Sequence, residues 1–374
     1  MTKQHSDFDL HGIVGIRLIG ASQKEVSMIV RQLGPIEKEL NREPDISIEF
    51  VEKLPINEAI NLTSVDDAGF TSDSFLVMRS KHKSSAKVQI PFDDIGTKHC
   101  KIVAERDISA IPLLIAIINV IMITKDVLPL HASALDYQGK GILATGWAKG
   151  GKTETLLAFT ARGGRYIGDE WIYLDQNNGF MYGIPEPIRL WSWHFDEMPE
   201  YRASLKRAEM LKLKSLGWVT HVLETMVNLR FVKKTLPMKL FRRINAVLKR
   251  QLYIQVPPKR LFGEQGLTPT GKPDKIFFVA SHESSDFVVN AVDPSWVAER
   301  MVFSLQDERK DFLAYYTRFR FAFPDKVNPV IEDLEQTQRQ LLLDVLKDKE
   351  CYTVYHPYPL SIPKIYDVLA PFIG

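Results

Sequence analysis

Hydrophobic and polar positions alternate in short stretches through the first third of the chain. Four of these stretches are predicted to be strands: residues 12–19, 46–51, 75–78 and 87–90. Between the first two, Ser22 is a typical helix-capping residue and Gly34 a typical helix-ending one, which predicts a helix through Leu33. We therefore expect an N-terminal α/β domain over residues 1–125. Regulatory, oligomerising and substrate-docking roles all remain open for this domain.

The longest apolar run, residues 111–123, contains 13 residues and includes Asn119. A helix needs about 20 apolar residues to span a bilayer. The run is therefore predicted to be a buried helix of a soluble protein.

A second pattern begins near residue 128 and continues to about residue 175. Residues 128–135 and 141–145 are predicted strands, Lys152 to about Thr160 an apolar-striped helix, and residues 165–168 a further strand. Strand, glycine-rich turn, helix and strand in this order are typical of a nucleotide-binding α/β sheet.

The rest of the chain continues the mixed α/β pattern. The further expected elements are a strand at 275–280, helices at 294–321 and 330–347, a strand at 351–355 and a short terminal helix. The predicted second domain, residues 126–374, therefore surrounds the glycine-rich turn.

That turn reads Gly146-Trp147-Ala148-Lys149-Gly150-Gly151-Lys152-Thr153 and meets every specified position of the G-x-x-x-x-G-K-S/T pattern. Glycines let main-chain N–H groups point at a phosphate, while the lysine bridges the β- and γ-phosphates and the hydroxyl holds Mg²⁺. Lys149 is either a second cation near the transferred phosphoryl group or a solvated loop lysine. The turn predicts binding of a nucleotide triphosphate with Mg²⁺.

Three acidic residues are placed to complete such a site. Asp169 and Glu170 follow the predicted strand 165–168 and should emerge at the carboxyl edge of the sheet. One carboxylate there can accept a proton from a hydroxyl while the other helps to hold Mg²⁺. Glu154 either serves the metal or favours the first turn of its helix. By itself, His131 on the preceding strand would be interpreted as a satisfied core residue.

The stretch from His131-Ala132-Ser133-Ala134 through the turn, Glu154-Thr155 and Asp169-Glu170 resembles the catalytic core of HPr kinase/phosphorylase, a family with the phosphoenolpyruvate-carboxykinase-like P-loop fold. The resemblance covers about 45 residues well. It implies that Lys152 and Thr153 bind phosphate and Mg²⁺, that Asp169 is the base on the acceptor hydroxyl, and that His131 lies beside Asp169 or the γ-phosphate. It also assigns Glu170 to the metal.

Two departures limit what carries over. Glu170 replaces an aspartate of the family, and the family's downstream glycine-rich signature is not recognisable. The phosphotransfer chemistry is therefore expected without HPr as the acceptor. Arg189, just after the core, is a candidate for acceptor binding. The neighbouring Trp191, Trp193 and His194 form either packing or a substrate platform.

Charge is distributed unevenly along the chain. Residues 201–260 contain 15 basic and two acidic residues, a net of +13, so the rest of the chain is −11 because the total is +2. Within this segment, residues 238–251 alternate apolar and basic positions at helical spacing. A basic helical insertion at about 196–260 is expected, either as a face for an anionic partner or membrane surface or as a solvated helical lid.

The two cysteines, Cys100 and Cys351, argue against a disulfide framework, and the N-terminus lacks a signal-peptide core. We expect a cytoplasmic protein, free or peripheral at the membrane, whose oligomeric state is open. The expected function is Mg²⁺-dependent transfer of the ATP γ-phosphate to a hydroxyl of a peptide serine, a sugar or another small molecule. The alternative is an ATP- or GTP-binding switch that engages a partner through its basic face.

Overall fold

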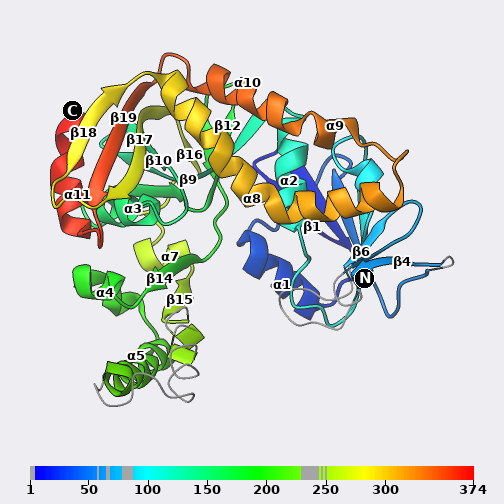
Figure 1. Ribbon diagram of the computed structural model, residues 1–374, viewed down its shortest axis with the longest axis horizontal. Coiled ribbons are helices and arrows are strands. Elements are labelled where there is room, and N and C mark those ends of the chain that lie inside the picture. Colours follow the sequence, from blue (N-terminus) through cyan, green and yellow to red (C-terminus); the bar gives the residue numbers. More distant parts are fainter. Residues whose placement is uncertain are drawn as a thin grey trace.

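The protein has a mixed α/β fold built on two large sheets (Figure 1). The structure is a computed structural model and describes residues 5–56, 59–64, 68–77, 87–228, 244–245, 247–248 and 251–374. No helix within these ranges is both long and apolar enough to cross a bilayer.

The first sheet uses residues from the N-terminal third. In the described chain it has eight strands in the order β1-β2-β3-β8-β7-β6-β5-β4. Their bounds are β1 His5–Leu10, β2 Val14–Ile19, β3 Ile46–Val51, β4 Asn61–Ser64, β5 Ala68–Phe70, β6 Phe75–Val77, β7 Val88–Ile90 and β8 Cys100–Glu105. A short 3₁₀ turn, η1 Phe92–Asp94, precedes β8.

The predicted strand at 12–19 begins two residues too early. Its true start is Val14, because His11 (φ 55°) and Gly12 (φ 76°) form the tight turn of a hairpin with β1. Strand β1 has no counterpart in the predictions. The strands predicted at 46–51 and 87–90 correspond to β3 and β7, and that at 75–78 to β6, although Met78 lies outside the described residues.

The predicted helix after Ser22 is confirmed as α1, Gln23–Leu33. Its first turn is held by the Glu25 carboxylate, which accepts a hydrogen bond from the Ser22 N–H (2.6 Å). Gly34 ends the helix with φ 77°, a conformation that a residue with a side chain rarely adopts.

The second sheet carries the glycine-rich turn. Among the described residues its strand order is β16-β13-β12-β9-β10-β17-β19-β18, with β11 also paired to β9. The bounds are β9 Val127–Tyr137, β10 Lys140–Thr145, β11 Arg165–Gly168, β12 Trp171–Asp175, β13 Met181–Gly183, β16 Thr270–Gly271, β17 Pro273–His282, β18 Val288–Val292 and β19 Glu350–Pro357. The strands predicted in this region are all confirmed.

Helix α3, Lys152–Thr160, crosses over β9 and connects β10 to β11, which lie on opposite sides of β9 and are both antiparallel to it. The carboxyl ends of β10 and β11 therefore point to the same edge of the sheet. Helices α3 and α11 (Ile362–Leu369) pack together on one face of the second sheet and share an apolar cluster with it. The 3₁₀ turn η3, Ala370–Phe372, follows α11.

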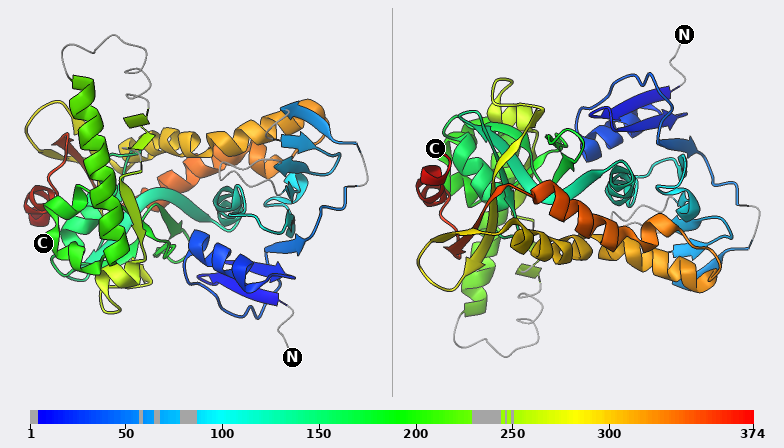
Figure 2. Two further views of the ribbon diagram at one scale, coloured as in Figure 1. Left: turned by 90° about the horizontal axis from the view of Figure 1, so that it is seen from below. Right: turned by 90° about the horizontal axis from the view of Figure 1, so that it is seen from above.

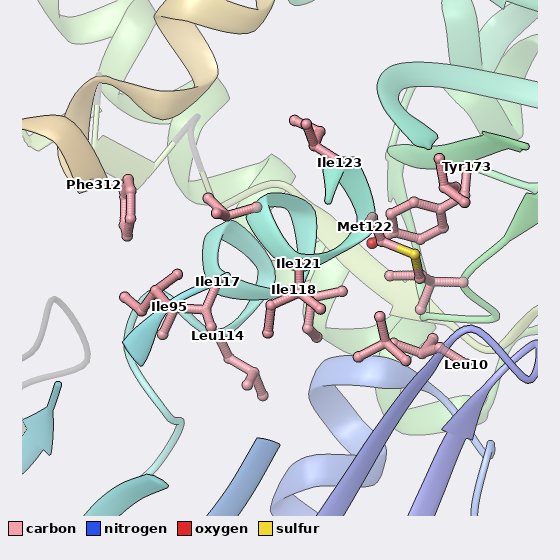
Figure 3. Packing of buried hydrophobic residues seen from close by; sticks show 14 of the residues in the cluster. Leu10, Ile95, Leu114, Ile117, Ile118, Ile121, Met122, Ile123, Tyr173 and Phe312 are labelled. Atoms are coloured by element: carbon pink, nitrogen blue, oxygen red, sulfur yellow. The ribbon is translucent and has the colours of Figure 1, made fainter. Parts of the chain in front are cut away.

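The opposite face belongs to a larger core that also includes the N-terminal sheet. Helix α2, Leu114–Ile123, lies in its centre, and Figure 3 shows its side chains between Phe312 of helix α8 (Pro294–Ala322) on one side and Leu10 of the first sheet on the other. The apolar run predicted to be a buried helix is confirmed, and its Asn119 accepts a hydrogen bond from the Tyr173 hydroxyl (3.0 Å). The division into two domains at residue 125 stays a prediction, because this core is continuous across it.

Helix α8, Pro294–Ala322, runs from one sheet to the other and contacts β4 and β5 as well as β9 and β19 (Figure 2). The predicted helix at 330–347 is two helices, α9 Pro329–Glu332 and α10 Leu334–Leu346. They meet at Asp333, whose ψ of 2° departs from the helical value.

Much of helix α5 (Arg207–Asn228) in the basic segment extends away from both sheets (Figure 1), whereas Tyr201 and Val256 of the segment pack in the apolar cluster of the second sheet. The described elements of this segment and of the residues that lead into it are β14 Ile188–Trp191, α4 His194–Glu197, η2 Pro199–Ser204, α5 Arg207–Asn228, β15 Tyr253–Val256 and α7 Pro258–Phe262. The predicted amphipathic helix at 238–251 falls largely outside the described residues, as do eight of the fifteen basic residues of the segment.

Candidate active site

The glycine-rich loop, residues 146–151, is pressed against strand β17. A Cβ atom on Gly146 would lie 2.3 Å from the Val279 carbonyl oxygen, and one on Gly150 would lie 2.7 Å from it. Gly146 also has φ 144°, which disfavours any residue with a side chain. Close packing of the backbone is therefore the physical reason for glycine at these two positions.

Distant elements hold the loop from behind. The buried His356 on β19 places Nε2 2.8 Å from the Gly150 carbonyl oxygen, and the Ser304 hydroxyl on α8 donates to the Gly146 carbonyl (3.4 Å). The Ser133 hydroxyl on β9 donates to the carbonyl of Lys152 (2.7 Å). Neither His356 nor Ser304 was found from the sequence, since each lies more than 150 residues from the loop.

Lys152 is buried beneath the loop and donates hydrogen bonds to the carbonyls of Gly146 (3.3 Å) and Trp147 (2.9 Å). Burial lowers the pKa of its ammonium, while the charges of Glu170, Asp169, Glu308 and Glu154 oppose that effect. A cation surrounded by acids, whose hydrogen-bond partners among the described residues are loop carbonyls, is available to an incoming phosphate.

Thr153 and Asp169 meet at the same edge of the sheet. The Thr153 hydroxyl lies 3.1 Å from Oδ2 and 3.2 Å from Oδ1 of Asp169, so it donates to that carboxylate. Burial, reinforced by the charge of Glu170, raises the pKa of Asp169 to about 7. Asp169 therefore lies at the carboxyl edge of the sheet next to the loop helix, as predicted, and the structure adds its contact with Thr153.

Glu170 has a positive φ of 67°, which is uncommon outside glycine and turns the chain directly into β12. Its Oε2 lies 3.1 Å from His131 Nε2, and Nδ1 of the same ring lies 2.6 Å from Oε1 of Glu308. Burial alone would lower the pKa of His131, but the two flanking carboxylates hold it raised. The hydrogen bond from His131 lowers the pKa of Glu170.

His131 thus contacts a carboxylate on each side of its ring. It lies beside the loop because the next residue of β9, Ala132, pairs with Thr145, the last residue before the loop. Glu308 comes from the middle of α8 and was missed by the sequence reasoning. Its helix shows no motif, and only the tertiary packing brings it to this edge.

The remaining loop residues face solvent. Trp147, Ala148 and Lys149 are exposed, and Lys149 has φ 63°. Glu154, just after the loop, contacts a residue outside it: its Oε1 lies 3.1 Å from Nε2 of the buried His194. Burial raises the pKa of Glu154, but the contact with His194 outweighs burial and lowers it overall.

A pocket of about 180 Å³ opens next to Glu170. Its other lining residues are Ile115, Trp171, Glu186, Pro187, Arg189 and Gln255. Arg189 lies 5.0 Å from the centre of the Tyr253 ring, and within the described chain Oε1 of Glu186 has no hydrogen-bond partner. Burial raises the pKa of Glu186 to about 8. The structure therefore places Arg189 at a pocket that adjoins the carboxylates, and adds Glu186 and Gln255 to it.

The protein oxygens at this site are too few to hold Mg²⁺ by themselves and would need phosphate oxygens of a nucleotide to complete its coordination. In the described part of the chain, no group of three or more His, Cys, Asp or Glu side chains is arranged to hold a metal. Mg²⁺ in nucleotide sites takes one or two protein oxygens and completes its shell with phosphate and water. The Thr153 hydroxyl and the half-exposed Glu170 carboxylate fit that smaller requirement.

No protein-family model matches the chain, and no curated protein sequence matches it.

Proposed function

We propose that the chain is a Mg²⁺-dependent kinase that transfers the γ-phosphate of ATP to a hydroxyl group, with a P-loop core of the HPr-kinase-like type. The observation that carries the proposal is the contact of Thr153 with Asp169 at 3.1 Å. It brings the loop's expected metal-binding hydroxyl and the expected base together, as phosphoryl transfer to an alcohol requires.

Binding of the triphosphate falls to the loop and Lys152. The N–H groups at the start of α3 and the buried ammonium provide the positive charge. The phosphate oxygens would replace the carbonyls of Gly146 and Trp147 as partners of Lys152. This exchange supports nucleotide binding because it replaces the two neutral carbonyl partners of the buried ammonium with negatively charged oxygens.

Asp169 has the properties of a general base. A proton acceptor works best when its pKa is near the working pH, and burial raises the pKa of Asp169 to about 7. His131 assists indirectly, since its charge keeps Glu170 ionised through the 3.1 Å contact. Thr153 and Glu170 are the residues that would hold Mg²⁺. When bound, Mg²⁺ would neutralise negative charge on the phosphates.

The acceptor enters through the pocket beside Glu170. At about 180 Å³ the pocket is smaller than the roughly 300 Å³ at which pockets for drug-sized ligands begin, so only a small hydroxyl-bearing group fits. A serine side chain of a peptide and a single sugar unit are both of this kind. Arg189, Glu186 and Gln255 offer this group a donor, an acceptor and an amide.

The cytoplasm is the compartment that we propose. Cys100 and Cys351 are both free and buried, which fits a reducing environment. The basic segment, whose described part includes α5, is proposed to face an anionic partner or membrane surface.

The test is phosphotransfer from γ-labelled ATP with Mg²⁺ to a panel of serine-containing peptides and sugars. Asp169→Asn should abolish transfer, by at least about a hundredfold for loss of a general base, while nucleotide affinity persists. Asp136→Asn, at the opposite end of β9 where Asp136 meets Arg165, is the matched control and should keep full activity.

Full activity of Asp169→Asn would overturn the assigned base. Retained nucleotide binding without transfer to any acceptor, with slow hydrolysis at most, would favour the alternative, in which the chain is a nucleotide-dependent switch.

A further inference from the structure

A second and larger pocket, of about 460 Å³, lies where α8, α9 and α10 meet. It shares no lining residue with the pocket beside Glu170 or with the glycine-rich loop. The residues that matter for its chemistry are Arg309, Leu313, Arg320, Glu332, Leu334 and Glu335. The proposed kinase function uses none of them.

Arg309 is the unusual member of this group. Its residue is only 7% exposed, and among the described residues neither Nε nor Nη1 has a hydrogen-bond partner. Burial lowers the pKa of the guanidinium to about 10. Buried donors that find no acceptor destabilise a folded protein. The chain therefore retains an arginine here that its own described contacts do not satisfy.

The other guanidinium of the pocket is in a different situation. Arg320 makes an ion pair with Glu332 and donates from Nη2 to the Pro324 carbonyl (3.0 Å). Glu332 also accepts from the Tyr316 hydroxyl (2.9 Å), so this acid is already occupied.

Glu335 does not fill the gap beside Arg309. It is exposed, and its charge raises the pKa of Arg309 only in part against the lowering by burial, while no ion pair joins the two side chains within the described chain. Leu334 and Glu335 are the first two residues of α10, so the pocket wall includes the amino-terminal end of a 13-residue helix. Such an end attracts anions, and the Arg309 guanidinium has the fork of donors that matches two oxygens of one anion.

We propose that this pocket binds a small molecule that carries a carboxylate or phosphate group, with the oxyanion on Arg309 and its apolar part against Leu313 and Leu334. The site is separate from the triphosphate site, and the inference does not rest on the proposed kinase activity.

The test is calorimetric titration of the full-length chain with succinate and, separately, with inorganic phosphate. All proteins in the test carry Lys152→Met, so that phosphate binding at the glycine-rich loop does not contribute. We expect binding of at least one anion at concentrations up to about 10 mM. Arg309→Met should weaken it tenfold or more. Lys310→Met is the matched control, because Lys310 is an exposed cation on the same helix, paired with Asp307; it should change the affinity less than twofold.

Preference for succinate would identify a carboxylate ligand, and preference for phosphate a phosphorylated one. Without ligand, Arg309→Met should melt at a higher temperature than its parent, since it removes an unpaired buried charge. Absence of binding for both anions, or equal binding in Arg309→Met, would overturn the proposal.

Discussion

Asp169 should make the nucleotide-free protein less stable as the pH rises. The residue is 3% exposed, and burial raises the pKa of its carboxyl from 3.8 to about 7. A tenfold change in a proton-binding constant corresponds to about 1.4 kcal/mol, so ionising this carboxyl in the folded state costs at most about 4 kcal/mol. Asp169→Asn removes that cost and keeps a side chain of the same shape.

The direction of the effect follows from proton binding. Between pH 3.8 and about 7 the folded protein holds a proton on Asp169 that the unfolded chain has lost, so stability decreases with rising pH. Asp169→Asn should therefore match the wild type near pH 4 and exceed it increasingly up to about pH 7. Above that pH the advantage should be constant.

The assay is guanidinium unfolding of both proteins without nucleotide at several values from pH 5 to pH 8. Asp136→Asn controls for the loss of one negative charge. If Asp169→Asn is equal to or less stable than the wild type at pH 8, the carboxylate is not buried against Glu170 as described. The reasoning about its suitability as a base would then be refuted as well.

Three further changes probe the same edge of the sheet. Gly146→Ala should cost about 3 kcal/mol or more of stability and abolish nucleotide binding, since a Cβ would meet the Val279 carbonyl at 2.3 Å; calorimetry and ATP titration measure both. Glu308→Gln should lower the pKa of His131, because the 2.6 Å contact that raises it loses its charge; NMR titration of the ring reports this, and an unchanged pKa would contradict it. Arg189→Met should raise the KM for the acceptor about tenfold with unchanged ATP affinity in steady-state kinetics; an equal loss of both would place Arg189 elsewhere.

The sequence was informative wherever the chemistry is local. The loop 146–153, helix α3 and strand β11 have the predicted bounds, because turn residues and apolar periodicity encode them within a few positions. Asp169 and Glu170 were identified for the same reason, since they directly follow a short buried strand.

Two predictions of secondary structure failed, in each case where contacts with another part of the chain set the backbone conformation. Strand β1 was missed because its first residues are polar, and it becomes a strand by pairing with β2. The helix predicted at 330–347 is broken at Asp333, near the point where Asn328 fixes the chain by donating to the carbonyls of Phe92 and Ile95 (2.7 and 2.8 Å).

The sequence alone determined the mixed α/β class, the glycine-rich loop and the two acids after β11, since each depends on neighbours within about 20 residues. Only the tertiary structure decided that Glu308 flanks His131, that His356 and Ser304 hold the loop, and that Arg309 is buried with Nε and Nη1 unpaired among the described residues. These contacts join residues far apart in the chain, and their geometry is set by the packing of α8 and β19 on the second sheet. A linear pattern carries no signal for such distances.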